Sequence, residues 1–362
     1  MILERLDPNQ VDWERLDAFS DRVVFQTREW VEFVSACQGA EPVFAALKDR
    51  GSTAGYFTGL VARRYGMSIL GSPMPGWTTS FMGFNLEDEV SRRDAAEALV
   101  DFAFGSLGCR HLELRDRDLL DSDVEGLGYE HTPWTGLEVD LRRPEEEIWA
   151  GMQGRCRTAI RKAERSGVVI EEASDIEFAA DCYSQLRDVF AKQSLVPPYD
   201  AERIRALIRH VHPSGRLLLL RARNPAGDCI ATGIFPAMNR SMHFLVGASW
   251  RNQQHLNPNE LLTWYAMRYW RDRGIETCDL GGYMSYKRKW GGREFSVPWL
   301  RKSSSRSIAV MRNIAQAAFA ARQGLSGRVR SRLSRFSGAS RGAAGAEPSP
   351  GPGRHGALES LI

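Results

Sequence analysis

Apolar residues recur at helical and strand spacings along this chain. In the first half, a helical stripe of Trp30, Val31 and Val34 lies between Thr27, which can cap a helix, and Gly39, which can end one. The next segments predict strands over 42–48, 55–64 and 67–72, a helix over about 86–107, and strands over 111–116 and 136–141. The predicted order of elements in this half is therefore a helix, antiparallel strands, a second helix and further strands.

The second half repeats that order of elements without a residue-level repeat. Residues 143–167 predict one helix or two short ones, and apolar spacing predicts further helices that include Phe178 and Ile204. Strands are predicted over 168–173, 216–222, 229–238, 241–249 and 275–280, with a helix from about Asn259 to Gly274. The pattern predicts a mixed α/β (α+β) fold of two tandem domains, residues 1–142 and 143–305.

Residues 1–305, called the body here, differ in net charge from the rest of the 362-residue chain. The whole chain carries a net charge of +3, but the first 305 residues hold 39 basic and 43 acidic side chains, a net charge of −4. Residues 306–362 carry nine Arg, no Lys and two Glu, and predict a basic amphipathic helix followed by a largely disordered Gly/Ser/Pro-rich tail. The body is too weakly charged for a duplex nucleic acid-binding protein. The tail either lies on an anionic membrane surface, contacts RNA, or is a solvated extension.

Other sequence features narrow the class of protein. The six cysteines are scattered without a metal-ligand spacing, so we expect neither a metal site nor a cysteine nucleophile. The chain contains no apolar stretch of membrane-spanning length, and its start has acidic residues where a signal peptide has basic ones. A cytoplasmic protein, with contact to the inner membrane face through the tail, is the resulting expectation.

Three segments of the second half resemble a known family: RCRTAIRKAERSGV (155–168), NPNELLTWYAMRYWRDRG (257–274) and CDLGGYMSYKRKWGG (278–292). They are similar to the FemAB-like branch of the GNAT acyltransferase superfamily, and FQTREWVEFV (25–34) and SPMPGWTTSFMGF (72–84) fit its first domain. The branch includes peptidoglycan-bridge aminoacyltransferases and acetyltransferases of exopolysaccharide synthesis. The resemblance covers about residues 20–300. It implies two GNAT-like domains that transfer an acyl or aminoacyl group to an amine of an envelope precursor.

Such a reaction requires a site that stabilises an oxyanion and accepts a proton. Lys287 matches the lysine of the family's aromatic-Lys-x-x-aromatic-Gly pattern and can hold a donor phosphate or the oxyanion; Lys289 would face the other way in an extended segment. Asp279 either receives the amine proton or caps the next turn. Gly281 and Gly282 allow the donor to approach the backbone closely, or simply form a tight turn.

Binding of the acceptor is predicted at two other places. Arg157, Arg161 and Lys162 lie on one basic helix, where guanidinium groups suit diphosphates or carboxylates; the alternative is a solvated face paired with acidic residues. Trp77 and Phe81 can stack on a sugar or nucleobase, or pack in the core, and Tyr283 is a weaker candidate for substrate binding. His243, in the middle of a predicted strand, is either a base or a buried core histidine.

The donor remains open at this point. Acetyl-CoA-binding members of the superfamily hold the pyrophosphate on a glycine-rich loop at a helix start, and the corresponding stretch RNQQHLNPNELL (251–262) has no glycine. Asn259 and the helix start could still bind phosphate. Three alternatives therefore remain for the function. The chain is an enzyme that uses acyl-CoA as its donor, an enzyme that uses aminoacyl-tRNA, or an inactive binding protein recruited by its tail.

Overall fold

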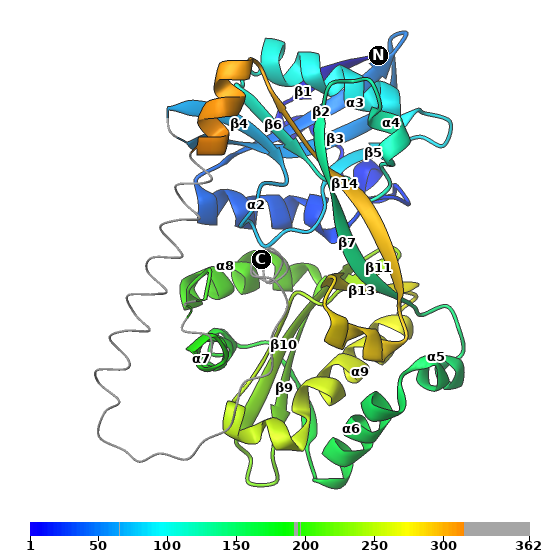
Figure 1. Ribbon diagram of the computed structural model, residues 1–362, viewed down its shortest axis with the longest axis vertical. Coiled ribbons are helices and arrows are strands. Elements are labelled where there is room, and N and C mark those ends of the chain that lie inside the picture. Colours follow the sequence, from blue (N-terminus) through cyan, green and yellow to red (C-terminus); the bar gives the residue numbers. More distant parts are fainter. Residues whose placement is uncertain (65, 192–194, 196, 315–362) are drawn as a thin grey trace.

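One sheet runs through both halves of the chain (Figure 1). The computed structural model describes residues 1–64, 66–191, 195 and 197–314. In these residues fourteen strands pair in the order β1-β2-β3-β4-β6-β14-β7-β13-β11-β10-β9-β8, with β5 on β3 and β12 on β10. The first seven strands are β1 (Ile2–Leu6), β2 (Glu41–Asp49), β3 (Ser52–Arg64), β4 (Met67–Ser72), β5 (Gly83–Leu86), β6 (His111–Leu114) and β7 (Glu130–Asp140). The others are β8 (Val169–Ala173), β9 (Leu217–Arg223), β10 (Cys229–Met238), β11 (Ser241–His243), β12 (Val246–Ser249), β13 (Thr277–Gly282) and β14 (Arg293–Ser303). The predicted mixed α/β class is confirmed.

Nine α-helices precede β14 in the described part of the chain. They are α1 (Trp13–Asp17), α2 (Arg28–Gln38), α3 (Arg92–Asp101), α4 (Asp121–Val124), α5 (Glu145–Gly151), α6 (Gly154–Arg165), α7 (Phe178–Ala191), α8 (Ala201–Val211) and α9 (Pro258–Arg271). The first helix prediction is confirmed in detail: the Thr27 side chain accepts a hydrogen bond from the Trp30 N–H, and Gly39 ends α2 at φ +60°. Residues 143–167 form two helices, since Met152 and Gln153 are extended between them.

Two predicted elements differ in the structure. The helix expected from residue 86 begins at Arg92, because β5 occupies Gly83–Leu86 and pairs with β3. The Ser91 hydroxyl caps α3 by accepting from the Asp94 N–H. The strand expected over 241–249 is divided into β11 and β12; both pair with β10, but β11 also pairs with β13.

Strands β7 and β14 connect the two halves (Figure 1). They pair antiparallel along Glu130–Glu138 and Arg293–Arg301, so the pair extends from one half to the other. At its far end β14 also pairs with β6, with Ser303 opposite His111. The last strand of the second half therefore completes the sheet of the first.

Helices α2 and α8 pack against each other between the halves (Figure 1). Their buried side chains share one apolar cluster with β10 and β12, and it includes Trp30, Phe33, Ile204 and Leu207. A second cluster lies between the second-half sheet and α6 and α9, and a third lies between the first-half sheet and α3. The shared cluster fixes how the two halves face each other, and this determines the shape of any site between them.

The basic tail lies mostly outside the described residues. Residues 306–314 are helical, and Arg312 contacts Glu130 of β7 through an ion pair of 2.6 Å. Residues 315–362, which carry most of the predicted tail, are not part of the description. No helix in residues 1–64, 66–191, 195 and 197–314 is long and apolar enough to cross a bilayer.

Gly291 fixes the segment after β13 against α5, which gives a first testable expectation. Its φ is +75°, and an added Cβ would come within 2.2 Å of the Gly151 carbonyl oxygen. We expect Gly291→Ala to lower the free energy of unfolding by at least about 1–3 kcal/mol, because both the backbone conformation and the contact resist a side chain. Urea denaturation followed by tryptophan fluorescence measures this change.

The control is Gly154→Ala at the start of α6, where a Cβ meets nothing within 4 Å. Equal stability of the two variants would contradict the expectation.

Candidate functional site

The sheet of the second half opens between β12 and β13. The parallel pairing of β11 with β13 reaches His243 opposite Asp279, and the Phe244 N–H then donates to the Asp279 carbonyl over 2.8 Å. Beyond this point β12 pairs with β10, while β13 pairs with β7 at Gly282. The two strands diverge, and a cavity of about 240 Å³ lies at the opening.

Lys287 lies in this opening on a 3₁₀ turn over Ser285–Trp290, and its side chain is 7% exposed. Its Nζ donates to the carbonyls of Leu280 over 2.7 Å and Gly282 over 3.0 Å. The lysine thus provides hydrogen bonds to β13 where a neighbouring strand no longer does. Burial lowers the pKa of Lys287 to about 8, and the nearby Asp279 carboxylate only partly opposes this.

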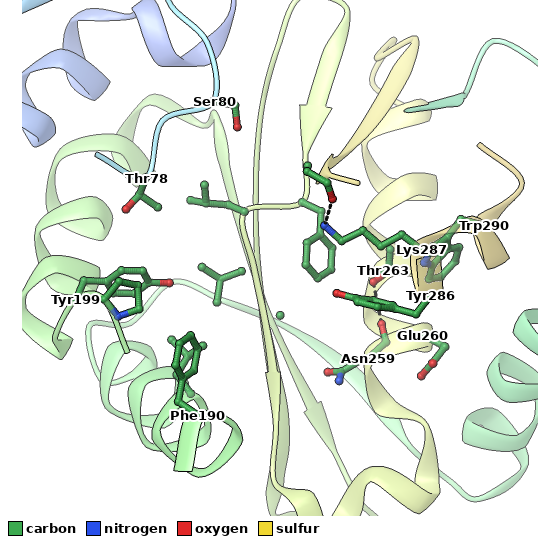
Figure 2. A pocket seen from close by; sticks show the side chains of 18 of the residues that line it. Thr78, Ser80, Phe190, Tyr199, Asn259, Glu260, Thr263, Tyr286, Lys287 and Trp290 are labelled. Atoms are coloured by element: carbon green, nitrogen blue, oxygen red, sulfur yellow. Dashed lines mark hydrogen bonds between the residues drawn. The ribbon is translucent and has the colours of Figure 1, made fainter. Parts of the chain in front are cut away.

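Lys289 lines the same cavity because the segment is helical rather than extended. Its Nζ forms an ion pair of 2.6 Å with Glu260 Oε1 in the first turn of α9. Figure 2 shows Lys287, Glu260 and Asn259 on one side of the cavity, with Tyr199 across from them. The two lysines differ in role: Lys289 is neutralised by a carboxylate, whereas Lys287 is held by carbonyl oxygens.

Asp279 lies behind the cavity rather than among the residues that line it. Its Oδ1 accepts a hydrogen bond from the Gly281 N–H over 2.6 Å, and its Oδ2 lies 3.3 Å from His243 Nδ1. Burial acts to raise the pKa of Asp279, but contact with His243 and the Gly281 N–H outweighs it, so the pKa is lowered. The His243 ring is buried and packs 4.5 Å from the ring of Phe25. This pair positions the turn that carries Gly281.

The three residues predicted to bind the donor all line the cavity. Gly281 has a φ of +77°, and an added Cβ there would lie 3.6 Å from Lys287 Nζ. Gly282 continues β13 on its open side. Asn259 lies in the first turn of α9, where its Nδ2 donates to Ser249 Oγ over 3.0 Å. Its Oδ1 is buried and has no hydrogen-bond partner among the described residues.

The five remaining predicted residues do not line the cavity. Arg157 Nη1 donates to carbonyls at the end of α5, including that of Ala150 over 2.9 Å. The Arg161 guanidinium lies 5.3 Å from the centre of the Trp149 ring, and Lys162 is exposed on α6. Trp77 is 2% exposed in the cluster between the halves, and Tyr283 packs at the second-half core with its N–H bonded to the Thr135 carbonyl.

Several cavity residues could not be found from motifs. Thr78, Ser80, Arg115 and Trp134 reach it from the first half, and Phe190 and Tyr199 from α7 and the segment before α8. Sequence pointed to the loop that contains Thr78 and Ser80 but selected Trp77, because an aromatic side chain is the common platform for a sugar. In the folded chain it is the polar neighbours Thr78 and Ser80, and not Trp77, that line the cavity.

No metal site accompanies the cavity. Across the described ranges, His, Cys, Asp and Glu side chains form no group of three or more that could hold a metal ion. The six cysteines are free thiols, four of them buried, and burial raises the pKa of each one.

Comparisons with known proteins concern the domain family and the fold. Residues 151–288 match the family model of the acetyltransferase (GNAT) domain, and no curated protein matches the sequence. The fold is similar to the crystal structure of FemX, with a TM-score of 0.67 at 14% identity over 82% of this chain and 96% of that one. It is also similar to the C-terminal domain of a putative lysylphosphatidylglycerol synthetase from Agrobacterium fabrum, with a TM-score of 0.53 at 13% identity over 84% of this chain and 95% of that one. A tandem GNAT protein from the clavulanic acid biosynthesis pathway matches with a TM-score of 0.50 at 10% identity over 84% and 99%.

The lowered pKa of Lys287 makes stability depend on pH in a defined direction. Below about pH 8 the lysine is charged in both states, so the fold bears the full cost of burying that charge. As pH rises above 8, the unfolded chain keeps a proton that the folded chain releases, so the cost declines. We expect wild type to gain about 2 kcal/mol over Lys287→Met between about pH 8 and 10.

Urea denaturation at several pH values checks this expectation. The control is Lys162→Met, which removes an exposed lysine and should follow the wild type across the range. A difference between wild type and Lys287→Met that does not change with pH would show that Lys287 titrates normally.

Proposed function

We propose that this chain, whose residues 151–288 match the family model of the acetyltransferase (GNAT) domain and whose fold is similar to that of FemX, transfers an acyl group from acyl-CoA to an amine. The acceptor we propose is an amino group of a cell-envelope polysaccharide or peptidoglycan precursor. The observation that carries the proposal is the opening between β12 and β13, where a buried lysine is hydrogen-bonded to β13 and the edge of β12 is free. The envelope acceptor rests on the family resemblance of residues 155–168, 257–274 and 278–292.

The free edge of β12 suits the amide-containing arm of CoA. The Trp250 N–H donates to the Ile230 carbonyl, and the antiparallel register places Val246 opposite Ile234. Since hydrogen-bonded residues alternate in such a pair, the N–H and C=O of Gly247 point away from β10. Gly247 is exposed and lines the cavity. An extended chain with amide groups can add to such an edge as a strand would.

The side chain of Lys287 supports the transfer step. The acceptor nitrogen attacks the thioester carbonyl, a C–N bond forms, the C–S bond breaks, and CoA leaves as a thiolate that takes up a proton. Two of the three Nζ protons of charged Lys287 are donated to Leu280 and Gly282, so the third can be donated to the oxyanion in the cavity. The same proton could instead be donated to a donor phosphate. In either role the charged form is the active one.

Residues of the first half would contact the acceptor. Thr78 and Ser80, which carry hydroxyl groups, and the aromatic Trp134 line the cavity. Hydroxyl and aromatic groups together suit a sugar, which has hydroxyls along its edge and an apolar face. Because these residues come from the first half, both halves would be needed to form the site.

One observation favours aminoacyl-tRNA as the alternative donor. The stretch before α9 is a 3₁₀ turn over Arg251–Leu256 that ends in Asn257 at φ +54°, and Glu260 lies in the first helical turn. A carboxylate there opposes binding of a pyrophosphate at the helix start. Its ion pair with Lys289 reduces this effect. A donor with a single ester linkage places fewer phosphates at this position.

Donor choice can be measured before the acceptor is known. We expect acetyl-CoA to bind the purified protein in isothermal titration calorimetry and to show weaker binding after a bulky change at the β12 edge, Gly247→Trp. Binding of aminoacyl-tRNA, with none of acetyl-CoA, would transfer the assignment to the alternative donor. Absence of both would favour a binding protein that has lost catalysis.

The role of Lys287 is tested by acyl transfer. With acetyl-CoA and a panel of amino sugars and muropeptides as acceptors, we expect Lys287→Met to lower kcat by about 10²–10³, the cost of losing an oxyanion donor. Arg288→Gln is the matched control, because Arg288 lies on the same 3₁₀ turn but is exposed and pairs with Glu294. Full activity of Lys287→Met would refute the oxyanion role.

A further inference from the structure

The helix over residues 306–314, called the 306–314 helix here, carries an apolar face that no described residue covers. Val310, Met311 and Ile314 are 56%, 49% and 63% exposed. Ile314 follows Val310 by four residues and Met311 by three, so the three side chains share one side of the helix. Three of the eight large apolar side chains that are exposed among the described residues therefore lie together on this one helix. Clustering of this kind marks an interaction surface, whereas single exposed apolar residues do not.

The opposite side of the 306–314 helix holds it against the first half. The helix follows directly on β14, and the Ser305 hydroxyl accepts a hydrogen bond from the Ile308 N–H over 3.4 Å. The Arg312 side chain is only 10% exposed and forms its 2.6 Å ion pair with Glu130 of β7. Figure 1 shows the helix, in orange, on the first half. This attachment leaves the apolar face pointing to solvent.

Exposed positive charge adjoins this apolar face. Four exposed basic side chains belong to the helix and the two segments beside its start: Arg63, Arg64, Arg110 and Arg306. The Ser304 N–H donates to the Arg110 carbonyl over 3.0 Å, and the Arg110 N–H donates to the Ser68 carbonyl over 2.8 Å. Ser68 in turn pairs with Arg63 across β3 and β4. None of the four arginines forms an ion pair with a described residue, so all four charges are available to an anionic surface.

The sequence extends this positive charge beyond the described helix. Residues 306–346 contain eight Arg and no Asp, Glu or Lys. The body, in contrast, has a net charge of −4. Charge of one sign thus begins at the exposed apolar helix and continues after it. An apolar helical face combined with a cluster of Lys or Arg is typical of segments that lie on anionic membranes.

We propose that the 306–314 helix and the arginines beside it bind the surface of an anionic lipid bilayer. Val310, Met311 and Ile314 enter the boundary between head groups and acyl chains, and the arginines meet lipid phosphates. A bilayer is favoured over RNA, because aliphatic side chains gain from contact with hydrocarbon and offer no ring on which a base can stack. This surface does not depend on the transfer reaction proposed above.

Cosedimentation of the full chain with lipid vesicles tests the apolar face. We expect binding to vesicles of phosphatidylglycerol and phosphatidylcholine in equal parts, weaker binding as salt is added, and little binding to phosphatidylcholine alone. Changing Val310, Met311 and Ile314 together to Ser should lower the partition coefficient at least about tenfold, because the apolar area that enters the bilayer is lost. These side chains are exposed, so the thermal midpoint should not change. The matched control is Val169→Ser on β8, which removes a side chain that is 63% exposed on the other half and should bind as the wild type does.

The arginines are tested by a second pair of variants. Arg63→Gln combined with Arg110→Gln should weaken binding to the anionic vesicles by roughly fivefold for each arginine removed. Lys162→Gln combined with Arg165→Gln is the matched control, since both side chains are exposed on α6 without an ion pair to a described residue. It removes the same charge from the second half and should leave binding unchanged.

Three results would overturn the proposal: no binding of the wild type to the anionic vesicles, unchanged binding of the triple Ser variant, or an equal loss in the Val169→Ser control. Two other occupants have their own signatures. Dimers in sedimentation velocity that the triple Ser variant loses, without vesicle binding, would assign the face to a second copy of the chain. A gel shift with single-stranded RNA, again without vesicle binding, would assign it to RNA. Because the readout is binding, the result stands even where no acyl transfer is detected.

Discussion

After Asp279, β13 loses its regular pairing, because β12 separates from it on one side and its register with β7 shifts before Gly282 on the other, and the second half is organised around that loss. An unpaired buried carbonyl or N–H costs about 1–3 kcal/mol, so each must find a substitute. On β13 the substitutes are side chains: Lys287 Nζ for two carbonyls and Asp279 Oδ1 for the Gly281 N–H. On β12, Gly247 stays open. Lys287, which bonds to these carbonyls, therefore also brings charge to the cleft, and the open edge of β12 is where a ligand can pair.

Local signals in the sequence were sufficient to predict the bounds of an element wherever its own residues determine them. Thr27 and Gly39 define the ends of α2 through a cap and a left-handed turn, both of which are chemistry of one or two residues. The break between β11 and β12 has no such signal, because residues 241–249 are mostly apolar and only the pairing with β10 and β13 divides them. The same limit applies to Lys289, whose direction depends on a 3₁₀ turn rather than on alternation.

The candidate site shows the same division between motif and tertiary placement. Lys287, Gly281 and Asn259 belong to recognisable segments and converge on one cavity. Arg157 also belongs to such a segment, but its guanidinium is used by the carbonyls that end α5. A basic residue on a helix looks the same in sequence whether its charge is free or already paired. Arg203 makes the opposite point, since nothing in its sequence context marks it as a partly buried residue with two guanidinium nitrogens that have no hydrogen-bond partner among the described residues.

The pairing of β14 with β6 bears on how the chain folds during synthesis. Ser303 hydrogen-bonds to His111 across a separation of 192 residues, so β6 leaves the ribosome long before the strand that covers its edge. Until then the first half exposes an unpaired strand edge, which is a template for wrong pairing. The two halves therefore cannot mature one after the other as independent domains. Instead, completion of the N-terminal sheet waits for the arrival of residue 303, and a chaperone that shields β6 in the interval would be acting where the nascent chain is most vulnerable.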